Sequence, residues 1–234
     1  MNPKIIKHQS IELNWLKPTQ VIDPKTLVLG SFNPFGPANK VKLVDYYYGR
    51  DTNHCWPSIA FSTVPYKNGK YYYQNLIAKK EIMNNHFCCL DVIDSLKVEC
   101  DDVNILNDFI DNNIYSGFSD QILFTTKTIY KNHLIIITRT YNKSILNFLQ
   151  NTTTIKRVIH TMGENRINQN GIYPVEYRLK ENGFKEFIIQ IIKICNQKNI
   201  DFIIESYSPS DYAVKNGGTD IDILRKWLND NLFL

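Results

Sequence analysis

Four short apolar runs, rich in β-branched side chains, constrain the fold of this chain more than any other feature. Each run is almost continuously apolar, which is typical of strands buried on both faces of a parallel sheet. Segments with helical spacing alternate with the runs, so the pattern predicts an α/β fold, a three-layer α/β/α sandwich around a central four-stranded parallel sheet. The predicted strands are residues 26–30, 87–92, 157–162 and 201–206, and the predicted helices are 76–84, 103–109, 144–149, 186–195 and 221–232.

One β-prone segment interrupts this alternation. Residues 122–128 and 133–140 are separated by a few polar residues, which predicts an added β-hairpin within a possible insertion at 112–143. The sequence contains no Pro/Ser-rich linker, low-complexity tract or internal repeat. We therefore expect one domain that covers residues 1–234.

Composition restricts the class of protein. Hydrophobic residues make up 43% of the 234 residues, which is enough for a large core and excludes intrinsic disorder. No apolar run approaches the roughly 18–20 residues of a membrane span, and the first ten residues lack the apolar stretch of a signal peptide. We expect a cytoplasmic protein with no membrane association. The net charge of +4 permits an anionic partner without requiring one.

Cysteine and histidine spacing gives no sign of a metal centre. The five cysteines form an odd set without a C-x-x-C pair, so we expect reduced thiols and no disulfide framework. The histidines at 54, 86, 133 and 160 are scattered without ligand spacing, so we expect no metal and no cofactor. The glycine motifs of nucleotide-binding α/β enzymes are absent, which weakens that class of function.

Ligands of open α/β sheets bind outside the carboxyl ends of the strands. Residues 30–37, 91–95, 162–165 and 206–210 follow the four predicted strands, and all are polar or turn-forming. We therefore expect these four loops to converge on one edge of the sheet and to form the functional site.

Several motifs in and near these loops occur in a fixed order. Their ordered set resembles the uracil-DNA glycosylase superfamily, and most closely its hypoxanthine-DNA glycosylase-like branch, over residues 27 to about 228. The resemblance implies an enzyme that flips a base out of DNA and hydrolyses its N-glycosidic bond, leaving an abasic site, without a metal. The motifs are Leu29-Gly30-Ser31, Tyr47-Tyr48 with Asn53 and Trp56, Leu90-Asp91-Val92, Ile155-Lys156-Arg157-Val158 with Gly163, and Glu205-Ser206-Tyr207-Ser208-Pro209.

The chain also departs from the branch's pattern. The first loop, at 32–37, is longer than the family's, Glu205 stands in place of a proline, and Leu90 stands in place of a tryptophan. The last loop lacks the histidine that stabilises the base anion in other branches, and residues 112–143 have no counterpart. These departures bear on the substrate more than on the reaction.

The resemblance implies that an asparagine holds the attacking water behind C1′. Asn53 matches the catalytic asparagine of the branch. Asn33 is the competitor, because other branches carry an Asn-Pro-Gly turn after the first strand and this chain has Asn33-Pro34. The structural alternative is that either side chain only satisfies a turn.

The base-binding residues that the resemblance suggests lie in the first two loops and in the segment 46–56. Backbone N–H groups of residues 31–35 would stabilise the departing base, and aromatic rings would stack on it unless they belong to the core. Asp91 matches a base-reading position. A carboxylate there accepts hydrogen bonds and cannot donate to uracil O4, which favours hypoxanthine or a modified cytosine. The alternative is that Asp91 caps a helix beginning near Ile93. The full set is Ser31, Phe32, Phe35, Tyr48, Trp56 and Asp91.

The last loop is the predicted DNA-binding segment. Hydroxyl and backbone donors there would hold phosphates, and Tyr207 would enter the duplex as a wedge, whereas a plain Ser-Pro turn is the alternative. Basic residues near the first and last loops would form a rim that suits DNA phosphates. The predicted contacts are Arg50, Ser206, Tyr207, Ser208, Ser210 and Lys215.

The leading hypothesis is therefore a monofunctional DNA glycosylase for a deaminated or otherwise modified base. It would act in base excision repair or in defence against phage DNA that carries modified bases. DNA with such a base is the expected partner, and no obligate protein partner is evident. The alternative is a non-catalytic DNA-binding module with the same fold, but the polar residues around Ser31 and Asn53 are intact, which favours the enzyme.

Overall fold

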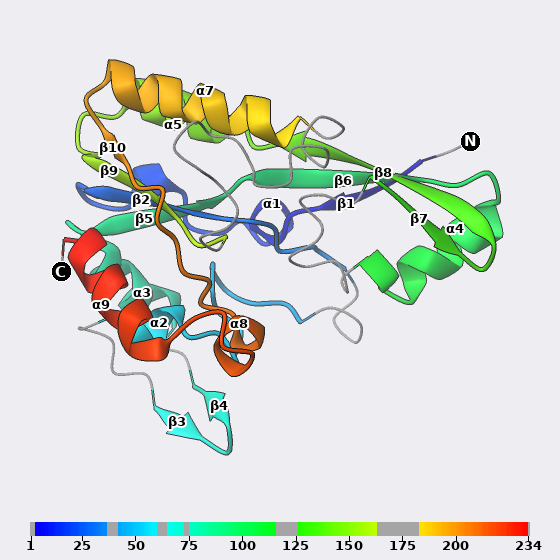
Figure 1. Cartoon of the computed structure of the whole chain (residues 1–234), viewed down its shortest axis with the longest axis horizontal. Helices are drawn as coiled ribbons and strands as arrows, with labels where there is room; N and C mark the ends of the chain where they lie inside the picture. Colours follow the sequence, from blue (N-terminus) through cyan, green and yellow to red (C-terminus); the bar gives the residue numbers. More distant parts are fainter. Residues whose placement is uncertain are drawn as a thin grey trace.

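A parallel sheet of four strands, in the order β10-β9-β2-β5, forms the centre of the molecule (Figure 1). The structure is a computed structural model that describes residues 3–36, 42–59, 65–72, 75–115, 126–162 and 183–233. It confirms the mixed α/β class and the predicted four-stranded parallel sheet. The strands are β2 (Thr26–Gly30), β5 (Phe87–Asp91), β9 (Arg157–His160) and β10 (Asp201–Phe202).

The continuous apolar runs identify the strands but not all of their ends. Every residue of β2 and β5 is buried, as expected for strands with both faces covered. β9 and β10 stop earlier than predicted, at His160 and Phe202. The chain stays buried for two residues after His160 although the regular ladder has ended. The apolar run therefore indicates which residues are buried, and burial continues for two residues beyond the end of the strand.

The five predicted helices are all present. Asparagine or aspartate side chains cap three of them by accepting backbone N–H bonds, at Asn75, Asp102 and Asp220. Figure 1 shows α5 and α7 together on one side of the parallel sheet, and α2, α3 and α9 on the other. The five predicted helices are α3 (Leu76–Met83), α4 (Val103–Asp111), α5 (Ser144–Asn151), α7 (Phe184–Gln197) and α9 (Ile221–Asn231). Shorter helices are α1 (Gln9–Glu12), α2 (Cys55–Ser58), α8 (Asp211–Lys215) and the 3-10 turn Pro18–Gln20.

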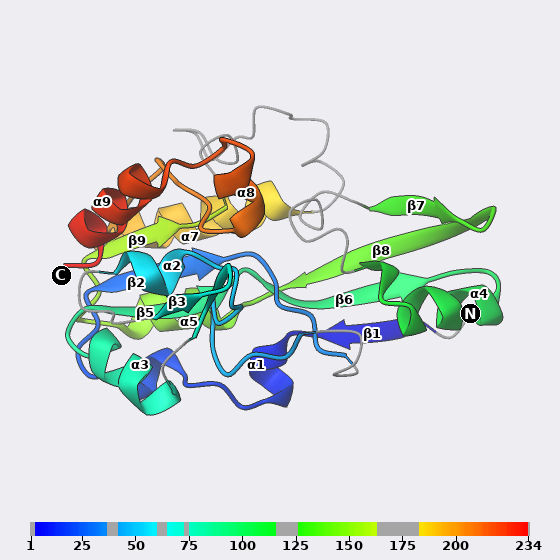
Figure 2. The ribbon, with the colours of Figure 1, turned by 90° about the horizontal axis from the view of Figure 1, so that it is seen from below.

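A second, antiparallel sheet continues directly from the first. Its strand order is β1-β6-β8-β7, and β6 follows β5 without a loop. Figure 2 shows β6 and β8 extending well beyond the parallel sheet. The strands are β1 (Lys4–Lys7), β6 (Ile93–Glu99), β7 (Lys127–Tyr130) and β8 (His133–Tyr141).

The existence of β6 corrects the sequence analysis. Residues 91–95 were expected to form a loop, with a helix near Ile93 as the alternative, and both expectations are wrong. In β6, Leu96 and Val98 are buried while Lys97 and Glu99 between and after them are partly exposed. That period of two is the pattern of a half-buried strand, which a search for continuous apolar runs does not detect.

The predicted hairpin is present as β7 and β8, although residues 122–125 of the prediction lie outside the described residues. Its turn is Lys131-Asn132, and both residues have left-handed φ values, of 47° and 65°. A two-residue turn of this kind matches the twist of the flanking strands. Because β8 pairs along most of β6, the hairpin belongs to the second sheet.

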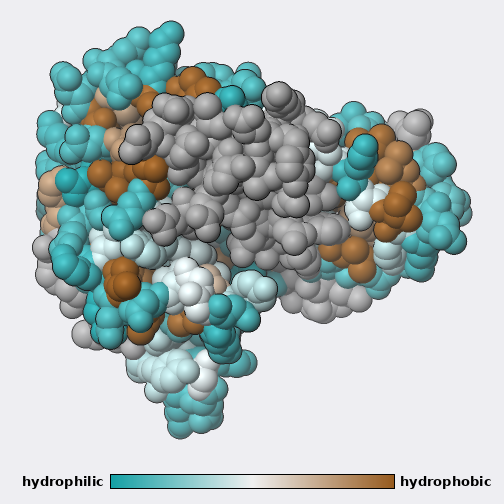
Figure 3. Space-filling view, viewed as in Figure 1, coloured by the Kyte–Doolittle hydropathy of each residue, from teal (hydrophilic) through white to brown (hydrophobic). Residues whose placement is uncertain are grey.

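One hydrophobic cluster includes buried residues of both sheets, among them Leu27 and Ile135. Apolar side chains also reach the surface at the outer end of the second sheet (Figure 3), where Ile129, Leu134 and Ile136 are exposed. A small hairpin, β3 (Tyr66–Lys67) and β4 (Lys70–Tyr71), completes the strands of the described residues. None of the helices in the described ranges is long and apolar enough to cross a membrane.

Candidate functional site

The carboxyl ends of three parallel strands meet at one place. Gly30 and Asp91 are register partners at the ends of β2 and β5. The N–H of Thr161, just after β9, donates to the carbonyl of Leu29 at 3.0 Å. The expected convergence of the first three loops is therefore observed for the residues that the structure describes, whereas residues 163–165 lie outside them.

Asp91 is the centre of this meeting point. Its Oδ2 accepts hydrogen bonds from Asn33 Nδ2 at 2.9 Å and from His8 Nε2 at 2.8 Å. Both Asp91 and His8 are about 2% exposed, so these bonds are shielded from solvent. Two donors on one oxygen compensate much of the cost of burying a carboxylate.

Gly30 allows the carboxylate to lie against the end of β2. A Cβ atom at Gly30 would be 2.1 Å from Asp91 Oδ1 and 3.0 Å from the hydroxyl of Tyr48. No real Cβ approaches another atom that closely, so a residue with a side chain here would displace Asp91. The glycine is thus required by the close approach of Asp91 and Tyr48.

His8 is held in one orientation by its neighbours. The backbone N–H of Ser10 donates to His8 Nδ1 at 3.0 Å, and the Ser10 hydroxyl lies 2.7 Å from the same atom. Nδ1 therefore acts as the acceptor, and the ring proton is on Nε2, directed at Asp91. The ring also stacks beside Tyr47 and meets Trp15 edge-on.

His8 is the functional candidate that the sequence analysis missed. It follows β1, and the N–H of His8 bonds to the Asp94 carbonyl while the N–H of Gln9 bonds to the Asn33 carbonyl. Its position therefore depends on the pairing of β1 with β6. No motif or spacing around His8 signals that long-range pairing, and neither strand was predicted.

Tyr48 adds a hydroxyl to the same strand ends. Its Oη lies 2.9 Å from Thr161 Oγ1. Burial, together with the nearby Cys89 and Asp91, raises the pKa of the Tyr48 phenol well above its ordinary value, so the hydroxyl stays protonated. Tyr48 has a φ of 58°, a conformation that side-chain-bearing residues adopt rarely and that concentrates at functional sites.

The two candidate asparagines have different surroundings. Asn33 is joined to Asp91 through its amide nitrogen, which directs its carbonyl oxygen away from the carboxylate. Asn53 Oδ1 accepts the N–H of Cys55 at 2.9 Å, at the start of α2. The Asn53 oxygen thus forms an Asx-type turn, as the structural alternative predicts. Asn33 is hydrogen-bonded to the Asp91 group.

The predicted stacking residues divide into core and half-buried side chains. Phe32 is 5% exposed and Trp56 is 1% exposed, and the indole N–H of Trp56 donates to the Tyr47 carbonyl at 2.9 Å. Phe35 and Tyr48 are half-buried, as is Ser31. The N–H of Phe35 bonds to the Lys7 carbonyl at 2.8 Å and is therefore engaged within the protein. Phe32 and Trp56 contribute to the core in this structure.

The last loop is fastened to the protein by its own polar side chains. Buried Ser206 donates from Oγ to the His160 carbonyl at 2.5 Å. The ring of Tyr207 packs edge-on against Trp227, and its hydroxyl donates to Glu205 at 2.8 Å. Ser208 donates to Ser210, and Ser210 caps α8 by accepting the N–H of residue 213.

The basic candidates lie near the contact between residues 50–54 and the last loop. Lys215 forms a 2.6 Å ion pair with Asp211, whose other oxygen is 3.4 Å from His54 Nε2. The Lys215 ammonium, with His54 as a smaller contributor, lowers the pKa of the Asp211 carboxyl. The N–H of His54 also donates to the Pro209 carbonyl at 2.8 Å. Arg50 is half-buried in the turn that precedes Asn53.

The predicted site residues thus fall into two groups. Ser31, Asn33, Tyr48 and Asp91 are brought together at the ends of β2 and β5. Arg50, Asn53 and the last loop meet through the bond between His54 and Pro209. No family model matches the chain, and no curated protein or solved structure matches it significantly.

Proposed function

We propose that this chain is a monofunctional DNA glycosylase built on a three-layer α/β/α domain. Helices on both sides of the parallel sheet support the layered organisation (Figure 1). One observation carries the proposed reaction, the 2.9 Å hydrogen bond from Asn33 Nδ2 to Asp91 Oδ2 at the carboxyl ends of β2 and β5. This hydrogen bond fixes the orientation of the Asn33 carboxamide at the edge of the sheet where α/β proteins bind ligands.

Hydrolysis of an N-glycosidic bond requires a water behind C1′ and passes through an oxocarbenium-like state. Because the amide nitrogen of Asn33 bonds to a carboxylate, its carbonyl oxygen is left to accept a hydrogen bond from that water. Donation to a carboxylate also polarises the amide and strengthens its oxygen as an acceptor. We therefore assign the water-holding role to Asn33 and not to Asn53, whose oxygen holds a turn.

Asp91 and His8 then act as positioning residues. The His8 ring is fixed by Ser10 and donates to Asp91, and Asp91 in turn orients Asn33. The role of base reader stays a prediction for Asp91. Asp91 Oδ2 accepts two hydrogen bonds from within the protein, and Oδ1 lies against Gly30. This arrangement favours a role in positioning Asn33 over direct contact with the base.

The flipped base would lie against Phe35 and Tyr48, the two predicted stacking residues whose side chains are partly exposed. The protonated hydroxyl of Tyr48 can donate a hydrogen bond to the base as well as accept one. Such a pocket suits a deaminated or otherwise modified base in DNA. Arg50 and Lys215 would contact phosphates from the contact between residues 50–54 and the last loop, with a contribution that falls as salt is raised.

The function is tested with duplex and single-stranded oligonucleotides that each carry one uracil, hypoxanthine or modified cytosine, and with phage DNA rich in modified bases. We expect abasic sites on at least one substrate, visible as strand breaks only after alkali. Asn33→Ala should form abasic sites much more slowly, whereas Asn151→Ala, on the exposed end of α5, should keep the wild-type activity. DNA binding without abasic sites on any substrate would instead support the non-catalytic DNA-binding module.

A further inference from the structure

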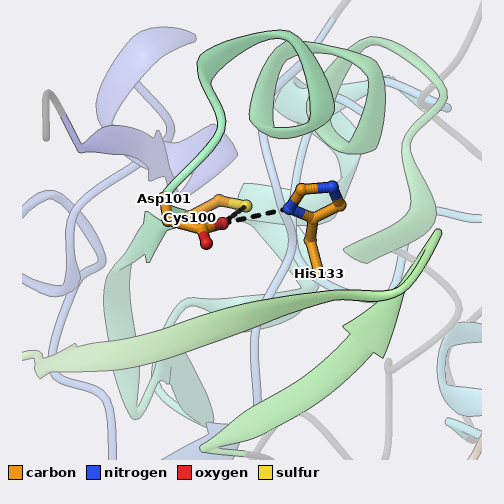
Figure 4. Close-up of side chains that lie close together, drawn as sticks. All are labelled: Cys100, Asp101 and His133. Atoms are coloured by element: carbon orange, nitrogen blue, oxygen red, sulfur yellow. Dashed lines mark hydrogen bonds and ion pairs between the residues drawn. The ribbon is translucent and has the colours of Figure 1, made fainter.

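Three side chains of the kinds that bind transition metals meet at the outer end of the second sheet (Figure 4). Cys100 and Asp101 follow the last residue of β6, and His133 is the first residue of β8. Their ligand atoms, one sulfur, one oxygen and one nitrogen, all lie within 4.8 Å of one another. The glycosylase proposal uses none of these residues.

The distances from Asp101 Oδ1 to the other two ligand atoms match tetrahedral zinc coordination. Cys100 Sγ lies 3.4 Å from Asp101 Oδ1, and His133 Nδ1 lies 3.1 Å from the same oxygen. Zinc bonds of about 2.3 Å to sulfur and about 2.0–2.1 Å to nitrogen and oxygen place such pairs about 3.5 Å and 3.4 Å apart. Shifts of a few tenths of an ångström would therefore bring each of these two pairs to the separation of ligands on one ion, and the sulfur and the nitrogen lie within 4.8 Å of each other.

We propose that Cys100, Asp101 and His133 bind one zinc ion, with water in the fourth position. Cys100 is buried while Asp101 and His133 are reachable from solvent, which gives the ion a route of entry. Thiolate, carboxylate and imidazole are all established zinc ligands, and this mixture is less suited to magnesium or calcium. The ion ties the tip of the β7–β8 hairpin to the junction of β6 and α4.

The segments that carry the ligands are held in place by independent contacts. The Asp102 side chain accepts the N–H groups of residues 104 and 105 and so fixes the start of α4 beside Asp101. At the hairpin tip, Tyr130 and Lys131 contact Asp108 of α4 at 2.7 Å and 2.8 Å. Zinc would therefore bind a largely preformed site, since both sides are already joined. Sequence spacing did not predict this site, because β6 and β8 bring together residues more than thirty positions apart.

The test uses the purified full chain, first treated with chelator and then titrated with zinc alone in competition with a chromophoric chelator. We expect one zinc per chain, and cobalt in its place should give the charge-transfer absorption of a thiolate ligand. His133→Ala should weaken zinc binding by roughly 100-fold or more, and Cys100→Ser should remove the thiolate absorption. His86→Ala, which removes a histidine at the other end of the molecule, is the matched control and should bind zinc like the wild type.

Melting curves with and without zinc provide the second measurement. Zinc should raise the Tm of the wild type and of the control, and leave that of His133→Ala unchanged, because only a bound ion stabilises the native state. If His133→Ala does not fold, Asp101→Asn replaces it with the same expectation. Equal zinc affinity in the wild type and the ligand variants, or cobalt binding without thiolate absorption, overturns the proposal. Cys100, Asp101 and His133 would then form only a hydrogen-bonded cluster that binds no metal.

Discussion

The Asp91 group and the Cys100 group are both clusters of polar side chains at strand ends, but they differ in burial. Asp91 and His8 are about 2% exposed and join segments distant in sequence, whereas the side chain of Asp101 is 75% exposed. Water cannot replace the bond between His8 and Asp91, because both side chains are buried. Water can replace the bonds of the exposed Asp101 carboxylate. The buried group is therefore expected to be sensitive to every truncation, and the outer group only when metal is present.

The largest effect should follow Asp91→Ala. The change leaves the His8 and Asn33 donors without their acceptor, and each donor left unsatisfied costs roughly 1–3 kcal/mol of unfolding free energy. Urea denaturation measures that loss, and excision should fall with it because Asn33 is no longer oriented. An Asp91→Ala protein as stable as the wild type would show that these hydrogen bonds do not hold the site together.

Gly30→Ala should lower the free energy of unfolding by about 3 kcal/mol, because it also separates Asp91 from its two donors. The new Cβ, 2.1 Å from Asp91 Oδ1, would push the carboxylate off its two donors. Gly218→Ala is the matched control, since its Cβ would come no closer than 3.5 Å to any atom and should cost little. Equal stability of the two variants, measured by urea denaturation, would mean that Asp91 can move aside freely.

His160 should make the free energy of unfolding fall at acidic pH. Burial lowers the pKa of its imidazole from 6.5 to about 4, and its Nε2 donates to the Ile204 carbonyl at 3.0 Å. Below pH 6.5 the unfolded chain binds a proton that the folded chain does not, so stability falls as the pH drops towards 4. The loss from this residue is about 3 kcal/mol over that range. Urea denaturation at several pH values should show a shallower pH slope for His160→Gln, and an unchanged slope would contradict the assignment.

The smallest effect should follow Asp101→Ala in the absence of metal. The Asp101 carboxylate is exposed, so its bonds to His133 and Cys100 compete with water and contribute little to stability. We expect a Tm within error of the wild type without zinc. A clear loss of stability under metal-free conditions would place the outer group with the buried one and remove the contrast between them.

The sequence predicted the parallel sheet because β2 and β5 are buried along their whole length and therefore read as continuous apolar runs. It did not predict β6, whose alternating burial resembles a polar loop, or β1, which is a four-residue edge strand with lysine at both ends. The site follows the same division. The loops that contain Asn33 and Asp91 could be predicted from their places after apolar strands, whereas the choice of these two residues rested on the family resemblance. His8 could not, because it reaches Asp91 only through the pairing of β1 with β6.

We propose that Asn33, oriented by Asp91, holds the water that attacks C1′. The most direct measurement is single-turnover excision by the wild type, Asn33→Ala and Asn53→Ala on the best substrate of the panel, with DNA binding and melting curves recorded for each. We predict that Asn33→Ala lowers the excision rate by roughly 10²–10⁴-fold while DNA binding is retained, and that Asn53→Ala stays within about tenfold of the wild type. Near-wild-type excision by a folded Asn33→Ala protein, with the rate lost in Asn53→Ala, would contradict the claim and assign the water to Asn53.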